Sequence, residues 1–425
     1  MIISISTEIP RFQKMVEFVT ILYLAFMFIA LYFFSFFIIL TFRNRDKIFT
    51  YSKPNIKFSK TILIPAYNEQ ESIKETIDHI MALNYPKKNL EVIVINDGST
   101  DNTAELVKNL IKKYPNLKLI DKKNSGKADS LNQGVKKAKG ELIAIVDSDS
   151  FPSPESLKKL SGFFDNPKMG AVTSFVRVRN KNYSLFSKIQ SIEYLLMGWS
   201  RKLLDFVDSV YVTNGPLSLY RKSYVLKVGG FDPNSVTEDI DITWNMLNHN
   251  YKTSMCLDAD VSTIVPTKFK KWFRQRTRWG LGGLQAIQKY KSMFLKKGMF
   301  GAFILPYVSF SIILSLAIFL FSTYLILKNV LRRLLTITYS ISTQSTVFSL
   351  QDINLYPSII IFYFIILFTL SLSYSWYILK TTEFEEKLGI KKFFNILFYI
   401  LIYLTLYPLV WFASIYRFIM KDVKW

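Results

Sequence analysis

Residues 90–99 read LEVIVINDGS, an apolar run that ends in polar residues and a glycine. A run of this length, rich in β-branched residues, is typical of a buried strand, and the glycine permits a tight turn after it. Similar runs stand at residues 61–67, 117–120 and 142–146, separated by segments with helical spacing. Strands and helices that alternate at this spacing predict an α/β domain with a mostly parallel sheet and helices on both faces.

The helices between these strands are expected near residues 69–83, 102–113 and 130–139. In open α/β sheets, ligands bind beyond the carboxyl ends of the strands. Polar clusters stand at those ends, namely Asn68 and Glu69, then Asp97-Gly98-Ser99, then Asp147-Ser148-Asp149. The sequence therefore predicts one binding site along this edge of the sheet.

The chain has 54 Lys and Arg against 32 Asp and Glu, a net charge of +22. Cytosolic segments of membrane proteins are enriched in basic residues, and a pyrophosphate substrate or anionic lipids also favour them. We find no nucleic-acid-binding motif and expect no nucleic-acid partner. Cys256 is the only cysteine, and His79 and His249 are the only histidines. These counts exclude an intrachain disulfide and a thiolate metal cluster, and they argue against zinc and a histidine-based triad.

Four long stretches contain no charged residue, and each exceeds the roughly 20 residues that cross the hydrocarbon core of a bilayer. They are residues 18–42, 298–327, 353–379 and 393–416. The expected order is a tail (1–17), a transmembrane anchor (18–42), a globular domain (43–297) and a membrane bundle of three spans (298–425). The basic globular domain is expected in the cytosol, and the loop at residues 328–352 outside, in a multi-pass protein of the cell membrane.

Asp147 and Asp149 leave their strand on the same side, so a turn can aim both at a common ligand. Mg²⁺ or Mn²⁺ prefers such oxygen ligands and also takes substrate phosphates. Asp97 can accept a hydrogen bond from a base or a sugar, or it can cap the next helix. Surface loops contain D-x-D by chance, so neither motif is decisive alone.

Thr237-Glu238-Asp239 precedes an apolar-periodic segment at residues 240–247. Acidic residues are favoured in a first helical turn by the helix dipole. A carboxylate there can equally take the proton of an acceptor hydroxyl in a glycosyl transfer. Both readings stay open on this motif alone.

A strongly basic and aromatic stretch, KFKKWFRQRTRWGLGG, occupies residues 268–283. On a helix, Trp272, Gln275 and Trp279 share one face, and Arg278 lies near it. An arginine here can neutralise a departing pyrophosphate, and a tryptophan can form the floor under a sugar ring. An amphipathic helix at the membrane surface has the same composition, and both roles can hold on opposite faces. Residues 190–199 are expected to form a second interfacial helix.

Taken in order, these motifs resemble those of the processive family 2 glycosyltransferases, which include cellulose, hyaluronan and poly-N-acetylglucosamine synthases. The resemblance covers roughly residues 57–290, and it is closest in motif detail to the poly-N-acetylglucosamine synthases. The matching motifs are P-x-Y-N-E (Pro65, Tyr67, Asn68, Glu69), D-G-S (Asp97 to Ser99), G-K-x-x-x-L-N (Gly126, Lys127, Leu131, Asn132), D-x-D (Asp147, Asp149), T-E-D (Thr237 to Asp239) and Q-x-x-R-W (Gln275, Arg278, Trp279).

The resemblance implies a GT-A domain and assigns roles to its motif residues. Asp239 would be the general base, with Glu238 beside it, and Asp149 would hold Mg²⁺ or Mn²⁺. The nucleotide-sugar would contact Pro65, Tyr67, Glu69, Asp97, Lys127 and Asp147. The diphosphate and the acceptor would contact Gln275, Arg278, Trp279 and Gly215. Where the family often has two acidic residues before the glycine of D-G-S, this chain has Asn96 first.

The implied activity is that of an inverting hexosyltransferase. It would transfer a sugar, N-acetylglucosamine or another hexose, from a UDP-sugar to a growing surface polysaccharide. Coupling of this transfer to export of the polysaccharide is a further hypothesis. The alternative is the transfer of a single sugar to a lipid carrier or glycolipid. Four spans are few for a translocation path, which leaves a homo-oligomer or a secretion partner as alternatives.

Overall fold

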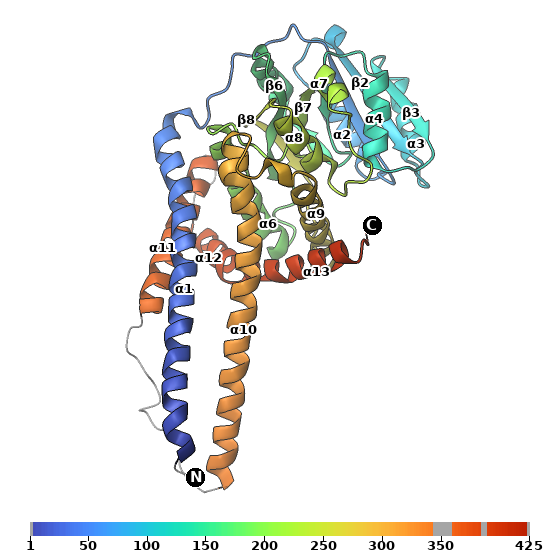
Figure 1. The fold of residues 1–425 in the computed structure, drawn as a ribbon. Helices are drawn as coiled ribbons and strands as arrows, with labels where there is room; N and C mark the ends of the chain where they lie inside the picture. Colours follow the sequence, from blue (N-terminus) through green and yellow to red (C-terminus); the bar gives the residue numbers. More distant parts are fainter. Residues whose placement is uncertain (1–2, 343–358, 384–388, 423–425) are drawn as a thin grey trace. The chain divides into compact units, whose positions relative to one another are not determined.

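The computed structural model describes residues 3–342, 359–383 and 389–422 (Figure 1). The chain divides into two compact units, residues 1–39 with 309–375, and residues 40–308 with 376–425. The second unit contains the whole α/β domain. The first contains most of the long apolar helices.

The strands are β1 (Lys60–Ala66), β2 (Leu90–Asp97), β3 (Leu117–Lys122), β4 (Leu142–Ile145), β5 (Ser150–Pro152), β6 (Met169–Val178), β7 (Ser218–Arg221) and β8 (Lys252–Thr263). The α-helices of the α/β domain are α2 (Ile73–Met81), α3 (Thr103–Ile111), α4 (Lys127–Lys137), α5 (Ser156–Ser161), α6 (Leu185–Asp205), α7 (Lys222–Lys227), α8 (Glu238–Asn248) and α9 (Phe269–Lys289). The remaining α-helices are α1 (Ile3–Asn44), α10 (Leu305–Ser342), α11 (Ile359–Thr382), α12 (Ile390–Phe398) and α13 (Tyr407–Ile419).

In the described residues the strands form one sheet in the order β3-β2-β1-β4-β7-β6-β8-β5. The first four are parallel neighbours and are the strands that the sequence predicts. The helices expected between them are present as α2, α3 and α4. β7 runs antiparallel to β4 and β6, and β5 runs antiparallel to β8, so the sheet is mixed but mostly parallel.

Alternate side chains of the central strands pack on opposite faces because the pleat has a period of two. Ile62 and Ile64 of β1 lie in the same core cluster as residues of α2 and α3. Leu63, between them, packs instead with residues of α4 and α8. Helices therefore cover both faces of the central strands, as the sequence predicts (Figure 1).

Four helical stretches are long and apolar enough to cross a membrane, at residues 20–47, 300–339, 361–382 and 390–419 of the described chain. Residues 3–17, expected as a tail, continue helix α1. The expectation of a loop from residue 328 was wrong, because α10 continues to Ser342. Leucines keep the helical spacing through this part of the chain. Residues 343–358, which include the start of the expected span 353–379, lie outside the described residues.

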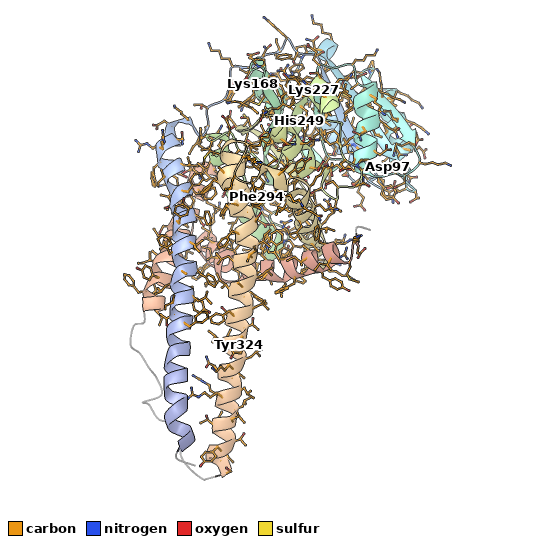
Figure 2. All side chains as sticks on the ribbon, viewed as in Figure 1. Asp97, Lys168, Lys227, His249, Phe294 and Tyr324 are labelled. Atoms are coloured by element: carbon orange, nitrogen blue, oxygen red, sulfur yellow. The ribbon has the colours of Figure 1, made fainter. Side chains whose placement is uncertain are left out.

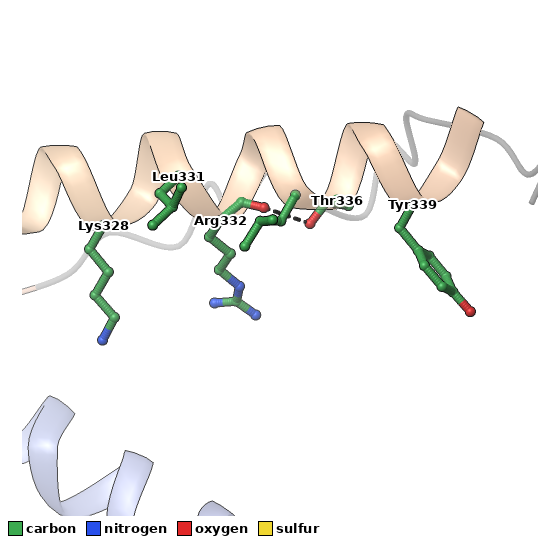
Figure 3. Close-up of a pocket in the computed structure, with 6 residues that line it drawn as sticks. Lys328, Leu331, Arg332, Thr336 and Tyr339 are labelled. Atoms are coloured by element: carbon green, nitrogen blue, oxygen red, sulfur yellow. Dashed lines mark hydrogen bonds between the residues drawn. The ribbon is translucent and has the colours of Figure 1, made fainter. Parts of the chain in front are cut away.

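Lys328 and Arg332 lie one turn apart on α10 and line a shallow hollow with an accessible volume of about 500 Å³ (Figure 3). Within the same unit, the hydroxyls of Tyr23 and Ser322 lie 3.0 Å apart and join α1 to α10. The rings of Phe34 and Tyr374, with centroids 5.4 Å apart, join α1 to α11.

The fourth apolar stretch packs against the α/β domain within the second unit. Helix α13 lies along α9, and Val410 and Ser414 are buried there. The Ser414 hydroxyl donates to the carbonyl of Thr277 at 3.2 Å. A Cβ at Gly280 would meet Ser414, so the missing side chain lets the two helices approach closely. The expected interfacial stretch at residues 190–199 forms the middle of α6, and Gln190, Glu193 and Trp199 are all buried.

Candidate active site

The turns that follow β1 and β2 are hydrogen-bonded to each other. The amide of Asn68 donates to the Ser99 hydroxyl at 3.0 Å, and the amide of Thr100 donates to Asn68 Oδ1 at 2.8 Å. Asn68 has a φ of 56°, a left-handed conformation that asparagine tolerates better than most residues. The P-x-Y-N-E and D-G-S motifs thus form one rim, on which Pro65 is buried and Tyr67 is half exposed.

Asp97, labelled in Figure 2, is the last residue of β2. Its carboxylate holds the loop that leads to Lys127. Its Oδ1 and Oδ2 accept hydrogen bonds from the amides of Ser125 and Gly126, each at 2.9 Å. Lys122 forms an ion pair with the same carboxylate. Gly98, with a φ of 71°, sits so close to this loop that a Cβ would meet the amide of Asn124. The carboxylate of Asp97 is thus already engaged by the turn before α4.

Asp147 and Asp149 follow β4, and Glu69 lies close enough to influence the charge of Asp149. Burial, together with the charges of Asp147 and Glu69, raises the pKa of Asp149 to about 7. Burial also raises the pKa of Glu69, although the Ser72 hydroxyl partly opposes this. Ser148, between the two aspartates, is fixed by a hydrogen bond of 2.8 Å from Thr76 of α2 to its carbonyl.

These carboxylates fit a divalent cation. Asp149 is half-buried, and the side-chain donors it has among the described residues are the hydroxyls of Ser150 and Thr263, at 3.3 and 3.5 Å. A cation would offset the repulsion that raises its pKa. No group of three His, Cys, Asp or Glu side chains with ligand geometry occurs in the part of the chain that the structure describes. The donor set therefore suits an ion that also takes phosphate oxygens from a substrate.

Lys127, the first residue of α4, joins two of the predicted motifs. Its Nζ lies 2.6 Å from Asp147 Oδ1 and 2.7 Å from Glu238 Oε1. Burial alone would lower the pKa of Lys127, but the two carboxylates outweigh it and raise that pKa above its ordinary value. The ion pair to Lys127 in turn lowers the pKa of Glu238 against the effect of burial. The lysine therefore stays charged between the D-x-D and T-E-D motifs.

Gly215 lies against the carboxylate of Asp147. A Cβ at this position would overlap both carboxylate oxygens, and the amide of Asp147 donates to the Gly215 carbonyl at 3.2 Å. Next to it, Asn214 is buried, and its Oδ1 accepts hydrogen bonds from Thr173 at 2.6 Å and Arg201 at 2.9 Å. The Nδ2 of Asn214 is buried with no partner among the described residues.

Asp239 lies in the first turn of α8, next to Glu238. Burial and the charge of Glu238 raise its pKa to about 6, although Lys127 and Arg278 act in the opposite direction. Its Oδ1 accepts a hydrogen bond from the amide of Ile240 at 2.9 Å. A carboxylate with this pKa is ionised at neutral pH and remains basic enough to accept a proton.

Helix α9 brings the Q-x-x-R-W motif to the start of α8. Arg278 Nη1 is 3.4 Å from the carbonyl of Val236, and its charge acts on Glu238 and Asp239. A Cβ at Gly282 would meet Thr237, so the two helices touch at the T-E-D motif. Gln275, Arg278 and Trp279 are half-buried, whereas Trp272 is fully buried and packs on Phe186 and Tyr403 instead.

The structure thus gathers Glu69, the D-x-D aspartates, Lys127, Gly215, the T-E-D motif and α9 at one edge of the sheet. It also shows residues that the sequence did not single out. Arg276 and Glu193 form a buried ion pair behind the Q-x-x-R-W motif. One signal was available for Glu193, because it is the only charged residue in the stretch QSIEYLLMGW and a buried charge requires a partner.

Residues 59–282, more than half of the chain, match the protein family described as "Glycosyltransferase like family 2". The poly-beta-1,6-N-acetyl-D-glucosamine synthase of Staphylococcus aureus (strain COL) is 35% identical over 262 residues, which are 60% of this chain and 63% of that protein. The synthase of the same description from Staphylococcus epidermidis is 35% identical over 230 residues, 53% of this chain and 55% of that protein. The match thus spans less than two thirds of these relatives.

Among solved structures, a mannosyltransferase from Pyrobaculum calidifontis, in complex with GDP-Man and Mn²⁺, has a TM-score of 0.60. The alignment covers 94% of this chain and 99% of that chain at 18% sequence identity. At this identity the likeness concerns the fold. It confirms the predicted GT-A domain.

Proposed function

Because the chain belongs to the glycosyltransferase-like family 2, we propose that it transfers N-acetylglucosamine or another hexose from a UDP-sugar to a growing surface polysaccharide. The donor and the product are suggested by the 35% identical poly-beta-1,6-N-acetyl-D-glucosamine synthases. The observation that carries the proposal is the environment of Asp239. Its raised pKa of about 6, beside Lys127 and Arg278, suits a base that works at neutral pH.

In this proposal Asp239 takes the proton of the acceptor hydroxyl as that oxygen attacks the anomeric carbon and the UDP leaves. A single displacement of this kind inverts the anomeric centre. Glu238 and Lys127 hold the base in place through their ion pair of 2.7 Å. The charge of Arg278 acts on Asp239, and in this proposal it also stabilises the leaving diphosphate.

The donor would lie along the rim formed by Pro65, Tyr67 and Glu69. Asp97 would recognise the base, either directly or through the turn that its carboxylate holds. Asp149, with Asp147 beside it, would hold Mg²⁺ or Mn²⁺. When bound, that ion would neutralise charge on the diphosphate.

The acceptor would lie between Gly215, Gln275 and Trp279. The unpartnered Nδ2 of the buried Asn214 supports a polar acceptor next to Gly215, because a buried amide gains a hydrogen bond when a sugar hydroxyl reaches it. The half-buried indole of Trp279 suits the apolar face of a sugar ring.

The apolar helices support a multi-pass protein of the cell membrane. We place residues 43–297 in the cytosol because this part of the chain is rich in Lys and Arg. In this arrangement the site would stand near the lipid surface, and a growing chain would leave by crossing the membrane. Export through this chain would require a homo-oligomer or a secretion partner, since few spans are available to enclose a path.

A donor panel tests the proposal. Purified protein in lipid is incubated with radiolabelled UDP-N-acetylglucosamine, UDP-glucose and UDP-galactose, with Mg²⁺ or Mn²⁺, and the products are sized. We expect label in a polymer, with UDP-N-acetylglucosamine as the best donor. A lipid-linked monosaccharide as the sole product would favour the alternative, transfer of one sugar to a lipid carrier. No transfer from any nucleotide sugar would reject both.

A further inference from the structure

A buried ion pair between two helices lies behind the Q-x-x-R-W motif. Arg276 of α9 and Glu193 of α6 are each 2% exposed. Arg276 Nη2 donates to Glu193 Oε2 at 2.5 Å, and Nε lies 3.4 Å from Oε1. A buried pair of charges is tolerated when its geometry is good and its remaining lone pairs are used.

The remaining lone pairs of Glu193 accept hydrogen bonds from the C-terminal helical stretch, residues 390–419. The Tyr403 hydroxyl donates to Glu193 Oε2 at 2.7 Å, and the Tyr407 hydroxyl donates to Oε1. Tyr407 also accepts a hydrogen bond from Arg276 Nε at 3.2 Å. The carboxylate of Glu193 therefore connects α6, α9, the turn that contains Tyr403 and the start of α13.

Arg276 also contacts two residues of the Q-x-x-R-W motif. Its Nη1 donates to Gln275 Oε1 at 2.6 Å. The centre of its guanidinium lies 4.1 Å from the centroid of the Trp279 ring, a cation–π contact. One side chain thus fixes the rotamers of both Gln275 and Trp279, and Glu193 fixes that side chain.

We propose that Arg276, held by Glu193, is a positioning residue. It holds the side chains of Gln275 and Trp279 in the conformations needed for sugar transfer and links them to the C-terminal helical stretch. This inference rests on the proposed function. A displacement of about 1 Å at a reacting centre can cost on the order of 100-fold in rate. Lysine at position 276 would keep the charge, but it could not reproduce the bidentate contact and the stacking together.

The test compares two carboxylate-to-amide variants on α6 in the full-length protein. Glu193→Gln removes the charge that holds Arg276. Asp205→Asn is the matched control, because Asp205 pairs with the buried Lys202 at 2.8 Å on the same helix. Three quantities are measured for each: the ratio of sugar transfer to donor hydrolysis, the KM for UDP-N-acetylglucosamine, and hydrogen exchange of the α9 amides.

For Glu193→Gln we expect the transfer-to-hydrolysis ratio to fall about tenfold or more while the donor KM changes by less than about twofold. Exchange of the α9 amides near Gln275 should become faster. Asp205→Asn should lower the Tm but leave the ratio and the α9 exchange unchanged. If the Arg276–Glu193 pair had a purely structural role, both variants would have a lower Tm. The transfer-to-hydrolysis ratio and the α9 exchange would then not differ between the two variants.

The inference would be overturned if folded Glu193→Gln had the transfer-to-hydrolysis ratio and the α9 amide exchange of the wild-type protein. It would also be overturned if this ratio fell equally in Asp205→Asn. If Glu193→Gln does not fold, Tyr407→Phe removes one donor to the same carboxylate. It should lower the ratio in the same direction, and an unchanged ratio counts against the inference. An inactive wild-type protein would contradict the proposed function instead, and α9 exchange would still test the pair.

Discussion

Lys127 and Glu238 form an ion pair of 2.7 Å that joins the start of α4 to the start of α8. The same Nζ lies 2.6 Å from Asp147, so one cation connects three motifs that are far apart in the sequence. Asp239 follows Glu238 directly, and its pKa depends on this cluster.

The first prediction concerns the pH dependence of transfer. The pKa of Asp239 is raised to about 6, and a general base must be ionised, so activity should be lost as the pH falls through that value. We expect kcat/KM to level off above about pH 7 and to decrease about tenfold per pH unit well below pH 6. The measurement is kcat/KM for the donor between pH 5 and 8. An acid limb near pH 4 would contradict the raised pKa.

The second prediction is that Lys127→Met moves this acid limb. Lys127 lowers the pKa of Asp239, so its removal should raise that pKa and shift the limb to higher pH. Activity at neutral pH should also decrease, because Asp147 and Glu238 lose their shared cation. Lys123→Met is a suitable control, because Lys123 is an exposed lysine of the loop that leads into α4. A limb that stays in place in the Lys127 variant would show that this lysine does not act on the base.

The third prediction uses the close approach of Gly215 to Asp147. A methyl group at position 215 would overlap the Asp147 carboxylate, so Gly215→Ala must displace it. We expect transfer to decrease about 100-fold, since small displacements at a reacting centre have effects of this size. In Gly283→Ala, the control, the added methyl group would meet nothing within 4 Å. Transfer by Gly215→Ala at the rate of the control would refute a tight fit at Asp147.

The fourth prediction concerns the metal ion. Chelation with EDTA should abolish transfer, and Mg²⁺ or Mn²⁺ should restore it, because Asp149 has few other partners to stabilise its charge. Asp149→Asn should remain inactive at any metal concentration. Its folding should be unharmed, since the amide replaces a carboxylate whose charge is disfavoured by partial burial and by Asp147 and Glu69. Full activity in EDTA would show that transfer does not require a metal ion.

The parallel half of the sheet and the gathering of the motifs could be predicted because they depend on local patterns. Apolar runs such as residues 90–95 define strands, and parallel strands bring their carboxyl ends to one edge. The clustering of Glu69, Asp147 and Asp149 follows from that edge. Position in the family pattern then indicates which residue would serve as the base.

Features that depend on tertiary contacts could not be predicted. Arg276 is one of several basic residues in a row, so the sequence does not distinguish it from its neighbours. Only the packing of α6 on α9 shows that the Arg276 side chain is buried against Glu193. The length of α10 was missed because Lys328 and Arg332 interrupt the apolar run, although long basic side chains do not interrupt a helix. The packing of α13 on α9 could not be predicted either, because an apolar stretch has the same composition whether it packs against lipid or against protein.

The central claim is that Asp239 is the base of a glycosyl transfer. It is tested most directly by measuring the incorporation of radiolabel from UDP-N-acetylglucosamine into product by wild-type protein and by Asp239→Asn, with binding of UDP measured in parallel. We predict that the wild-type protein makes product and that Asp239→Asn is slower by about 100-fold or more with nearly unchanged UDP binding. Turnover of Asp239→Asn at the wild-type rate would contradict the account.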